Sequence, residues 1–228
     1  MGSSLRLLIS SGPTREPIDA VRFLSNYSTG VMGQCLAEEA LRRGHRVTMV
    51  NGPTSLAPPS QARVVRIESG EEMRQALRRE MRRADVLIMA AAVCDFRPRG
   101  VATSKLARRG ELSLHLEATP DIVAGLPRRR GQLIVGFALE DRAVRERAAR
   151  KLREKRLDLI VGQHVNGTSA PFGRRKVEAM ILRSSGDVQE LGKVSKPALA
   201  RALLDEIEQL WYGQKDMKSS QGGVAPCC

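Results

Sequence analysis

Short apolar runs recur along most of the chain, separated by stretches in which apolar residues are spaced more widely. Each run is four to six residues long, which is too short for a buried helix and typical of a strand covered on both faces. Strands of this kind belong to parallel sheets whose faces are covered by helices. The runs therefore predict six parallel strands, at residues 5–10, 46–50, 64–67, 86–90, 133–137 and 157–161.

Helical spacing of apolar residues appears between these runs. Met32, Leu36 and Ala40 lie about one turn apart, with hydroxyl residues before them to begin a helix and Gly44 after them to end it. Strands that alternate with helices in this way predict an α/β fold with a doubly wound, mainly parallel sheet. Further helices are predicted at residues 71–83, 121–126, 142–156 and 197–211.

Three segments depart from this alternation. Residues 111–117 alternate polar and apolar side chains, which predicts an antiparallel excursion with one face in water. Residues 177–183 and 187–191 predict a C-terminal hairpin. The end of the chain is polar and contains glycine, so we expect a single folded domain at 1–212 and a disordered tail at 213–228.

The chain of 228 residues has a formal net charge of +13, from 38 Lys and Arg against 25 Asp and Glu. A basic surface attracts phosphate, either of a polynucleotide or of a small anion. Only 3% of the residues are aromatic, which is too few for a base-stacking platform, and much of the charge lies in short runs typical of solvated faces. We therefore expect small anionic ligands and no nucleic acid partner.

The cellular compartment is inferred from patterns that the sequence lacks. No apolar run approaches the roughly 18 residues of a membrane-spanning helix, and the first ten residues do not have the layout of a signal peptide. The four cysteines form no CxxC pair and no zinc-binding pattern. We expect a cytoplasmic protein with reduced thiols and no membrane partner.

The loop after the first strand holds a candidate anion site, because ligands of doubly wound sheets bind outside the carboxyl ends of the strands. At residues 28–33, Ser, Thr and Gly open a helix whose free backbone N–H groups are suited to phosphate. The alternative is simple helix capping, with glycine for close packing. No GxGxxG fingerprint is present, and the second strand ends in Asn51 and Gly52 instead of an acidic residue that would bind a ribose.

The loops after the later strands add further candidates. Three alanines at residues 90–92 would let a flat ring approach the backbone, and Asp95 could bind a ribose hydroxyl or a Mg²⁺ ion, although tight packing and a turn-forming aspartate fit equally. Lys105 suits a triphosphate, whereas most surface lysines are only solvated. Lys151 and Lys155 are four residues apart and so share one face of a helix. The histidines are far apart and neither GxSxG nor HExxH occurs, so a hydrolase triad is unsupported.

Taken together, these loops resemble a known family. The segments SGPTREPIDAVRFLSNYSTGVMG, AAAVCDFRP, ATPDIVAGL, GFALE and KLREKRLDLIV, with Lys105 between the second and third, follow the order and spacing of phosphopantothenoylcysteine synthetase, or phosphopantothenate-cysteine ligase. The likeness runs from about Leu5 to Leu210. Several motifs in register are far more specific than any one of them.

The resemblance implies a Rossmann-like fold, a homodimer and a reaction in two steps. The carboxylate of 4'-phosphopantothenate would attack a nucleoside triphosphate to give an acyl-nucleotide and pyrophosphate, and the amine of L-cysteine would then displace the nucleotide. The motif style implies the bacterial type, which uses CTP with Mg²⁺, and ATP is the alternative. The flavin decarboxylase half of many bacterial members is absent from this sequence, so a separate phosphopantothenoylcysteine decarboxylase is expected.

The resemblance also assigns roles to residues by their position. Asn26 would hold the acyl-nucleotide while cysteine attacks, Lys105 would neutralise the triphosphate, and Asp95 would contact the nucleotide and its metal ion. The positions that match nucleotide-binding residues are Gly12, Ser28, Gly30, Met89, Ala90, Ala91, Asp95, Lys105, Pro120, Asp121, Ile122, Val123, Phe137, Lys151 and Lys155.

Some positions depart from the family pattern. Val31 stands where Lys or Arg is usual, and Gln163 and Val177 stand where Asn is usual. These departures motivate one alternative, a nucleotide-binding relative without ligase activity. A second alternative, an NAD(P)-dependent oxidoreductase, is favoured only by the fold class and disfavoured by the missing dinucleotide fingerprint.

Overall fold

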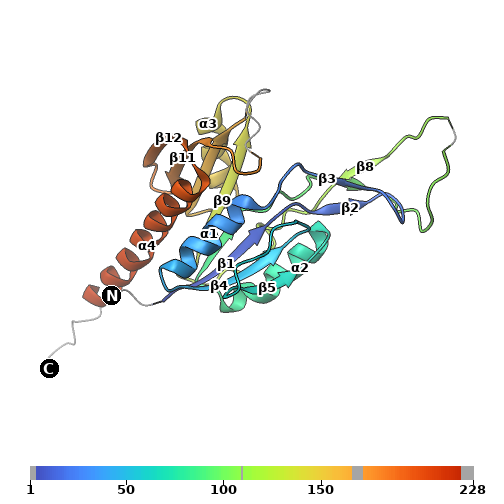
Figure 1. Ribbon diagram of the computed structural model, residues 1–228. Helices are drawn as coiled ribbons and strands as arrows, with labels where there is room; N and C mark the ends of the chain where they lie inside the picture. The colour runs from blue at the N-terminus through green and yellow to red at the C-terminus, as the bar shows by residue number, and fades with distance from the viewer. Residues whose placement is uncertain (1–3, 109, 166–171, 222–228) are drawn as a thin grey trace.

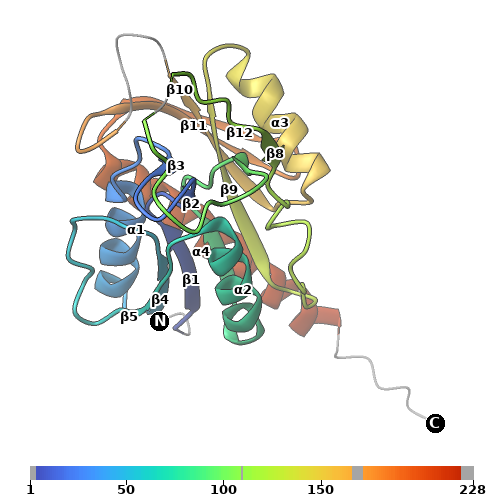
Figure 2. The same cartoon turned by 90° about the vertical axis from the view of Figure 1, so that its right-hand side faces the viewer.

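The computed structural model of the chain describes residues 4–108, 110–165 and 172–221. The main sheet contains β1 (Arg6–Ser11), β4 (Arg46–Asn51), β5 (Arg63–Arg66), β6 (Val86–Met89), β9 (Leu133–Glu140), β10 (Leu159–His164), β11 (Val177–Arg183) and β12 (Val188–Val194). The helices are α1 (Val31–Arg42), α2 (Gly70–Glu80), α3 (Val144–Glu154) and α4 (Lys196–Gln221), with a short 3₁₀ turn, Met81–Arg83, after α2. The helices cover both faces of the sheet (Figure 1 and Figure 2).

Six strands of this sheet are parallel, as the apolar runs predicted. The strand order is β12-β11-β10-β9-β6-β1-β4-β5, so β1 lies at the centre, between β4 and β6. The chain direction across the sheet reverses at β1 and β6, which is the switch point of a doubly wound, Rossmann-like sheet. The predicted fold class is confirmed, including the antiparallel C-terminal hairpin of β11 and β12.

Alternate residues of the central strands face opposite sides of the sheet and build two apolar layers. Leu7 and Ile9 of β1 pack in the layer that contains α1 and α4, whereas Leu8 packs in the layer that contains α2 and α3. Leu36 of α1 and Leu77 of α2 are both 0% exposed. Full burial of one such side chain contributes about 2–3 kcal/mol, so the two layers hold the strand exits in fixed positions.

Glycines flank helix α1 at both ends. Gly30 precedes it with φ 79° and Gly44 follows it with φ 81°, which are left-handed values that suit residues without a Cβ. At its end the N–H of Gly44 donates to the carbonyl of Leu41 (2.9 Å) and the N–H of His45 donates to the carbonyl of Ala40 (3.0 Å). This pair of bonds is a Schellman motif, and it confirms the predicted end of the helix.

Two small antiparallel pairs lie outside the main sheet. β2 (Arg15–Pro17) pairs with β3 (Phe23–Ser25) inside the loop after β1, which the apolar pattern did not predict. β7 (Phe96–Pro98) pairs with β8 (Leu116–Ala118), and the segment between them extends away from the sheet (Figure 1). We call residues 96–118 the arm. Of the strand expected at 111–117, only the last two residues belong to a strand, β8, because this end of the segment pairs with β7.

The helix expected at residues 121–126 is wrong, because these residues form a turn. The carboxylate of Asp121 accepts hydrogen bonds from the backbone N–H groups of Val123 (3.0 Å) and Ala124 (3.2 Å). An aspartate that binds its own following backbone in this way stabilises a turn in place of helix propagation.

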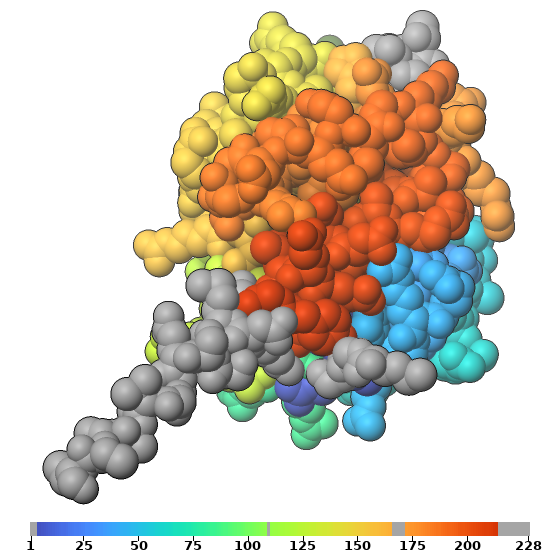
Figure 3. All heavy atoms as spheres, turned by 90° about the vertical axis from the view of Figure 1, so that its left-hand side faces the viewer, coloured from blue at the N-terminus to red at the C-terminus, as the bar shows by residue number. Residues whose placement is uncertain are grey.

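The C-terminal elements cover one face of the molecule. Figure 3 shows α4 between the β11–β12 hairpin and α1. The helix continues to Gln221, whereas we expected it to end at Trp211 and to be followed by disorder from residue 213. Residues 222–228, the rest of the predicted tail, lie outside the described residues. No helix in the described part of the chain is long and apolar enough to cross a membrane.

An ion cluster joins α1 to α4 at the amino edge of the sheet. Glu39, which is 8% exposed, accepts hydrogen bonds from Arg42 (2.8 Å) and Arg43 (2.7 Å). Arg43 also lies 2.8 Å from the carboxylate of Asp205 and 3.1 Å from that of Glu208 on α4. The hydrogen bond from Arg42 is the largest influence on Glu39; burial opposes it and Arg43 reinforces it, so the pKa of Glu39 falls to about 2.

A carboxylate whose pKa is lowered in the folded state stabilises the fold above its ordinary pKa of 4.5, and this contribution is lost as the pH falls toward 2. As the pH is lowered from 5 to 3, over ~2 pH units, we therefore expect the free energy of unfolding to fall less in the Glu39→Gln variant than in the wild type. The measurement is urea unfolding across this range. Glu38→Gln, which removes an exposed carboxylate from the same helix, is the matched control, and equal pH dependence in wild type and Glu39→Gln would contradict the account.

Candidate functional site

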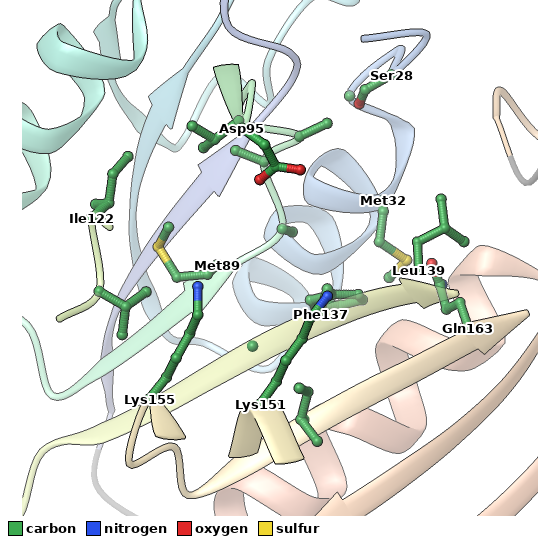
Figure 4. Close-up of a pocket in the computed structure, with 18 of the residues that line it drawn as sticks. Ser28, Met32, Met89, Asp95, Ile122, Phe137, Leu139, Lys151, Lys155 and Gln163 are labelled. Carbon is green, nitrogen blue, oxygen red and sulfur yellow. The ribbon is translucent and has the colours of Figure 1, made fainter. Parts of the chain in front are cut away.

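A cleft of about 480 Å³ opens at the carboxyl edge of the parallel strands. Its walls come from the start of α1, the exits of β6 and β9, the turn at residues 119–123 and the inner side of α3 (Figure 4). The described residues that line it are 28–32, 89–93, Asp95, 119–123, Gly136, Phe137, Leu139, Lys151, Lys155, Leu157, Ile160, Gln163, Phe172 and Lys196. Of the predicted nucleotide-binding residues, all but Gly12 and Lys105 therefore lie at one site.

The start of α1 forms a wall that can bind an anion. The cap residue Gly30 offers no side-chain hydrogen bond, and the first turn contains no acidic residue. The N–H groups of this turn therefore keep the partial positive charge of a helix N-terminus. The helix lies close against the exit of β1, because a Cβ at Gly33 would come within 2.3 Å of Ser11 Oγ.

Gly12 lies behind this wall. Its φ is 78°, and a Cβ there would come within 3.1 Å of the carbonyl oxygen of Gly52 at the exit of β4. Its own carbonyl accepts a hydrogen bond from the N–H of Ala92 (2.9 Å) after β6. Gly12 thus holds three neighbouring strand exits together, and it supports the cleft without lining it.

Asn26 lies beside the exit of β6. Its Nδ2 donates to the carbonyl oxygen of Ala92 (3.0 Å) and to Sγ of Cys94 (3.7 Å), and Ala92 lines the cleft. Both bonds run through the amide nitrogen, so Oδ1 is the atom that this side chain presents as an acceptor. Burial raises the pKa of the Cys94 thiol, which therefore contacts Asn26 in its neutral form.

Lys151 of α3 and Lys155, which caps the end of this helix, point into the cleft from one side (Figure 4). Lys151 Nζ lies 2.7 Å from an oxygen of Glu140, and Lys155 Nζ lies 3.2 Å from an oxygen of Asp121. Burial raises the pKa of Glu140, but hydrogen bonds from Lys151 and Arg147 outweigh it and the pKa is lowered. The carboxylates thus hold both ammonium groups in place over the floor of the cleft.

The floor itself is apolar. Phe137 of β9 and Met89 of β6 lie between the lysines and the start of α1, and Ile122 closes one end (Figure 4). Small residues at the exit of β6, Ala90 and Ala91, leave the backbone accessible beside these side chains. A flat, partly polar ring fits such a surface, since its face contacts apolar side chains and its edge can bond to backbone groups.

Asp95 is the acidic residue in the loop after β6. It is exposed and lines the cleft, and its loop is held by Thr119, which donates through N to the carbonyl of Asp95 (2.9 Å) and through Oγ1 to that of Cys94 (2.6 Å). Among the described residues, no group of three or more His, Cys, Asp or Glu could hold a metal ion. Mg²⁺ commonly takes one or two carboxylates together with phosphate oxygens and water, and Asp95 fits that mode.

Lys196 is a residue of the cleft that the sequence did not predict. It lies at the start of α4, lines the cleft and is 6% exposed, and its Nζ donates to the carbonyl of Gly173 (2.6 Å). Burial lowers the pKa of this ammonium group. No local motif marks it; a lysine before a proline at a helix start is an ordinary surface pattern, and its approach to the cleft depends on how α4 packs against α1.

Lys105 does not join the cleft of its own chain. It is exposed on the arm and is absent from the described residues that line the cleft. The adjacent Leu106 donates through N to Asp19 (3.0 Å), and its carbonyl accepts from Arg22 (3.0 Å). The hydrogen bond from Arg22, followed by that from Leu106, holds the pKa of Asp19 well below its usual range, so this buried carboxylate fixes the base of the Lys105 segment.

Comparison with known proteins relates this chain to a family. The family model described as the DNA/pantothenate metabolism flavoprotein C-terminal domain matches residues 3–210. The coenzyme A biosynthesis bifunctional protein CoaBC of Bacillus subtilis (strain 168) is 39% identical over 207 residues, which cover 90% of this chain and 51% of that protein. A cysteine/cysteine sulfinic acid decarboxylase from an unknown prokaryotic organism is 39% identical over 206 residues, which cover 89% and 57%. The chain thus spans about half the length of these relatives.

Two solved structures share the fold. The crystal structure of the C-terminal domain of CoaBC superposes with a TM-score of 0.78 at 38% identity, covering 92% of this chain and 96% of that one. A Cab2 variant in complex with phosphopantothenate-cysteine superposes with a TM-score of 0.74 and covers 93% and 89%, but at 17% identity it shows likeness of fold alone. The chain belongs to the family of the DNA/pantothenate metabolism flavoprotein C-terminal domain.

Proposed function

We propose that this protein is a ligase that joins 4'-phosphopantothenate to L-cysteine through an acyl-nucleotide, a step of coenzyme A biosynthesis. One observation carries the proposal: a helix N-terminus, an apolar floor and two lysines line one cleft, and Asn26 donates a hydrogen bond to Ala92, which also lines it. The likeness to the C-terminal domain of CoaBC supports the choice of substrates.

The first step requires two anions to meet. A carboxylate oxygen of phosphopantothenate forms a bond to the α-phosphorus of the nucleotide, the bond from that phosphorus to its bridging oxygen breaks, and pyrophosphate leaves. The N–H groups at the start of α1 supply fixed positive charge that offsets the repulsion. We assign the floor at Phe137 and the alanines at residues 90–92 to the base of the nucleotide.

The second step forms the amide. The amine of cysteine attacks the acyl carbon, the carbon–oxygen bond to the nucleotide breaks, and the nucleoside monophosphate leaves while the nitrogen loses a proton. Asn26, held through Nδ2, presents Oδ1 to the hydroxyl and amide N–H donors of the pantothenate part. It thus fixes the acyl carbon for attack. Asp95 is the residue that would hold Mg²⁺, which would neutralise charge on the phosphates.

We infer that CTP, rather than ATP, is the nucleotide, from the bacterial style of the motifs. The test is incubation with phosphopantothenate, L-cysteine and either nucleotide, with release of pyrophosphate and formation of phosphopantothenoylcysteine followed in parallel. We expect both products with CTP and fewer with ATP. Nucleotide binding without pyrophosphate would favour the non-catalytic alternative, and reduction of a carbonyl substrate by NAD(P)H would favour the oxidoreductase.

Replacement of Asn26 by alanine should separate the two steps. We expect the variant to release one equivalent of pyrophosphate per cleft and to accumulate the acyl-nucleotide, while overall turnover falls on the order of a hundredfold or more. Quenched reactions analysed by mass spectrometry measure the intermediate. The pyrophosphate burst is the internal control for folding, and an equal loss of both steps would contradict the assignment.

We further propose a homodimer formed through the arm. Large apolar side chains are exposed there and on the adjoining hairpin, including Phe23 (45% exposed), Phe96 (57%), Leu112 (56%) and Leu116 (47%). Apolar patches of this kind mark interaction surfaces. Because the arm carries Lys105 outside the cleft of its own chain, we expect Lys105 to serve the cleft of the second copy.

A subunit-mixing experiment tests this arrangement. Lys105→Ala should lower turnover on the order of a hundredfold, whereas Lys193→Ala, at an exposed position on β12, is the matched control. Co-expression of Lys105→Ala and Asn26→Ala chains should restore roughly a quarter of wild-type activity, since one cleft of each mixed dimer then has both residues. Unchanged turnover in Lys105→Ala alone would refute the role, and no recovery on mixing would refute its supply by the second copy.

A further inference from the structure

Lys196 joins three elements at one end of the cleft. Its Nζ donates to the carbonyl of Gly173 (2.6 Å), and the N–H of Gly173 donates to Oγ1 of Thr29 (3.2 Å) in the loop before α1. The start of α4 is thereby held beside the start of α1. Lys196 and Thr29 both line the cleft, so the ammonium group lies near the free N–H groups of the first turn.

Two positive features thus occupy the same end of the cleft. Helix α1 has no side-chain cap and no acidic residue in its first turn, and Lys196 lies at the start of α4, which packs against α1. Burying an ammonium group beside a helix N-terminus costs free energy. An anion bound between them would offset this cost, because each feature favours negative charge.

Gln163 provides an independent sign of a ligand at this end. Its side chain is 9% exposed and lines the cleft, and its Nε2 has no hydrogen-bond partner among the residues that the structure describes. Figure 4 places it beside Met32 and Leu139, at the end of the cleft away from Lys155. A buried amide donor without a partner costs about 1–3 kcal/mol, which an acceptor atom on a ligand would recover.

The opposite end has a different electrostatic character. There Lys155 forms an ion pair with Asp121, and Lys151, between the two ends, forms one with Glu140. These carboxylates already offset the lysine charges and would repel a polyphosphate that came close. The end at α1, by contrast, presents donors from three different elements, α1, β10 and α4, to the same space.

We propose that Lys196 binds the phosphate tail of the nucleotide, at the end of the cleft where Gln163 and the first turn of α1 also present N–H donors. This inference rests on the proposed use of a nucleoside triphosphate. It fixes the direction of the ligand: the phosphates lie at the start of α1 and α4, and the base lies toward Met89 and Ile122.

Calorimetry with CTP and CMP on the full chain tests this assignment, since the two ligands differ only in their phosphates. We expect Lys196→Met to weaken CTP binding on the order of tenfold to a hundredfold and to leave CMP binding unchanged. Lys196→Arg, which keeps the charge, should retain most of the preference for CTP. Lys193→Met, an exposed lysine on β12, is the matched control.

The ratio of the two affinities within one variant separates binding from folding. Equal loss of CTP and CMP binding in Lys196→Met would show a structural role and overturn the proposal, as would wild-type affinity for both. A wild-type chain that does not prefer CTP to CMP would also overturn it. If the wild type prefers CTP and Lys196→Met loses this preference, but no phosphopantothenoylcysteine forms, the ligase function fails and the phosphate-binding role of Lys196 stands.

Discussion

The parallel pairing of β1 with β4 and β6 is the constraint on which the site depends. Because neighbouring strands run in the same direction, their exits lie at one edge, and the loops that follow them meet there. Gly12 lets these loops pack closely. Its carbonyl accepts a hydrogen bond from Ala92 after β6, and the absence of a side chain leaves room for the backbone of Gly52 after β4. A side chain at Gly12 would press against the carbonyl oxygen of Gly52, at 3.1 Å from its Cβ, and would be strained at a φ of 78°.

The distribution of charge explains how a chain with net charge +13 can favour a small anion. Many of its arginines form ion pairs on the surface, as Arg6 does with Asp85 and Arg63 with Glu80. Within the cleft, carboxylates hold Lys151 and Lys155, whereas the start of α1 has no acidic residue in its first turn. The result is a site that is polarised along its length, with paired charges at one end and N–H donors at the other.

The sequence predicted the parts of the fold that follow from local pattern. Apolar runs were enough to predict the parallel strands, and alternation of polar and apolar residues was enough to predict the C-terminal hairpin. The end of α1 followed from Gly44, which takes a left-handed conformation. What it could not predict depends on contacts between distant segments. Lys196 reaches the cleft only because α4 packs on α1, and the turn at Asp121 replaces a helix because a side chain binds the following backbone. The position of Lys105 outside its own cleft likewise depends on the arm, which Asp19 holds at Leu106.

The central claim is that the carboxyl-edge cleft binds a nucleoside triphosphate with its phosphates at the start of α1. A crystal structure of the wild-type chain soaked with CTP and Mg²⁺ tests it most directly. The account predicts the cytosine ring over Phe137 and the phosphates within hydrogen-bonding distance of the first-turn N–H groups of α1. Phosphates beside Lys155 with the base at α1, or a nucleotide bound elsewhere on the molecule while the cleft stays empty, would contradict it.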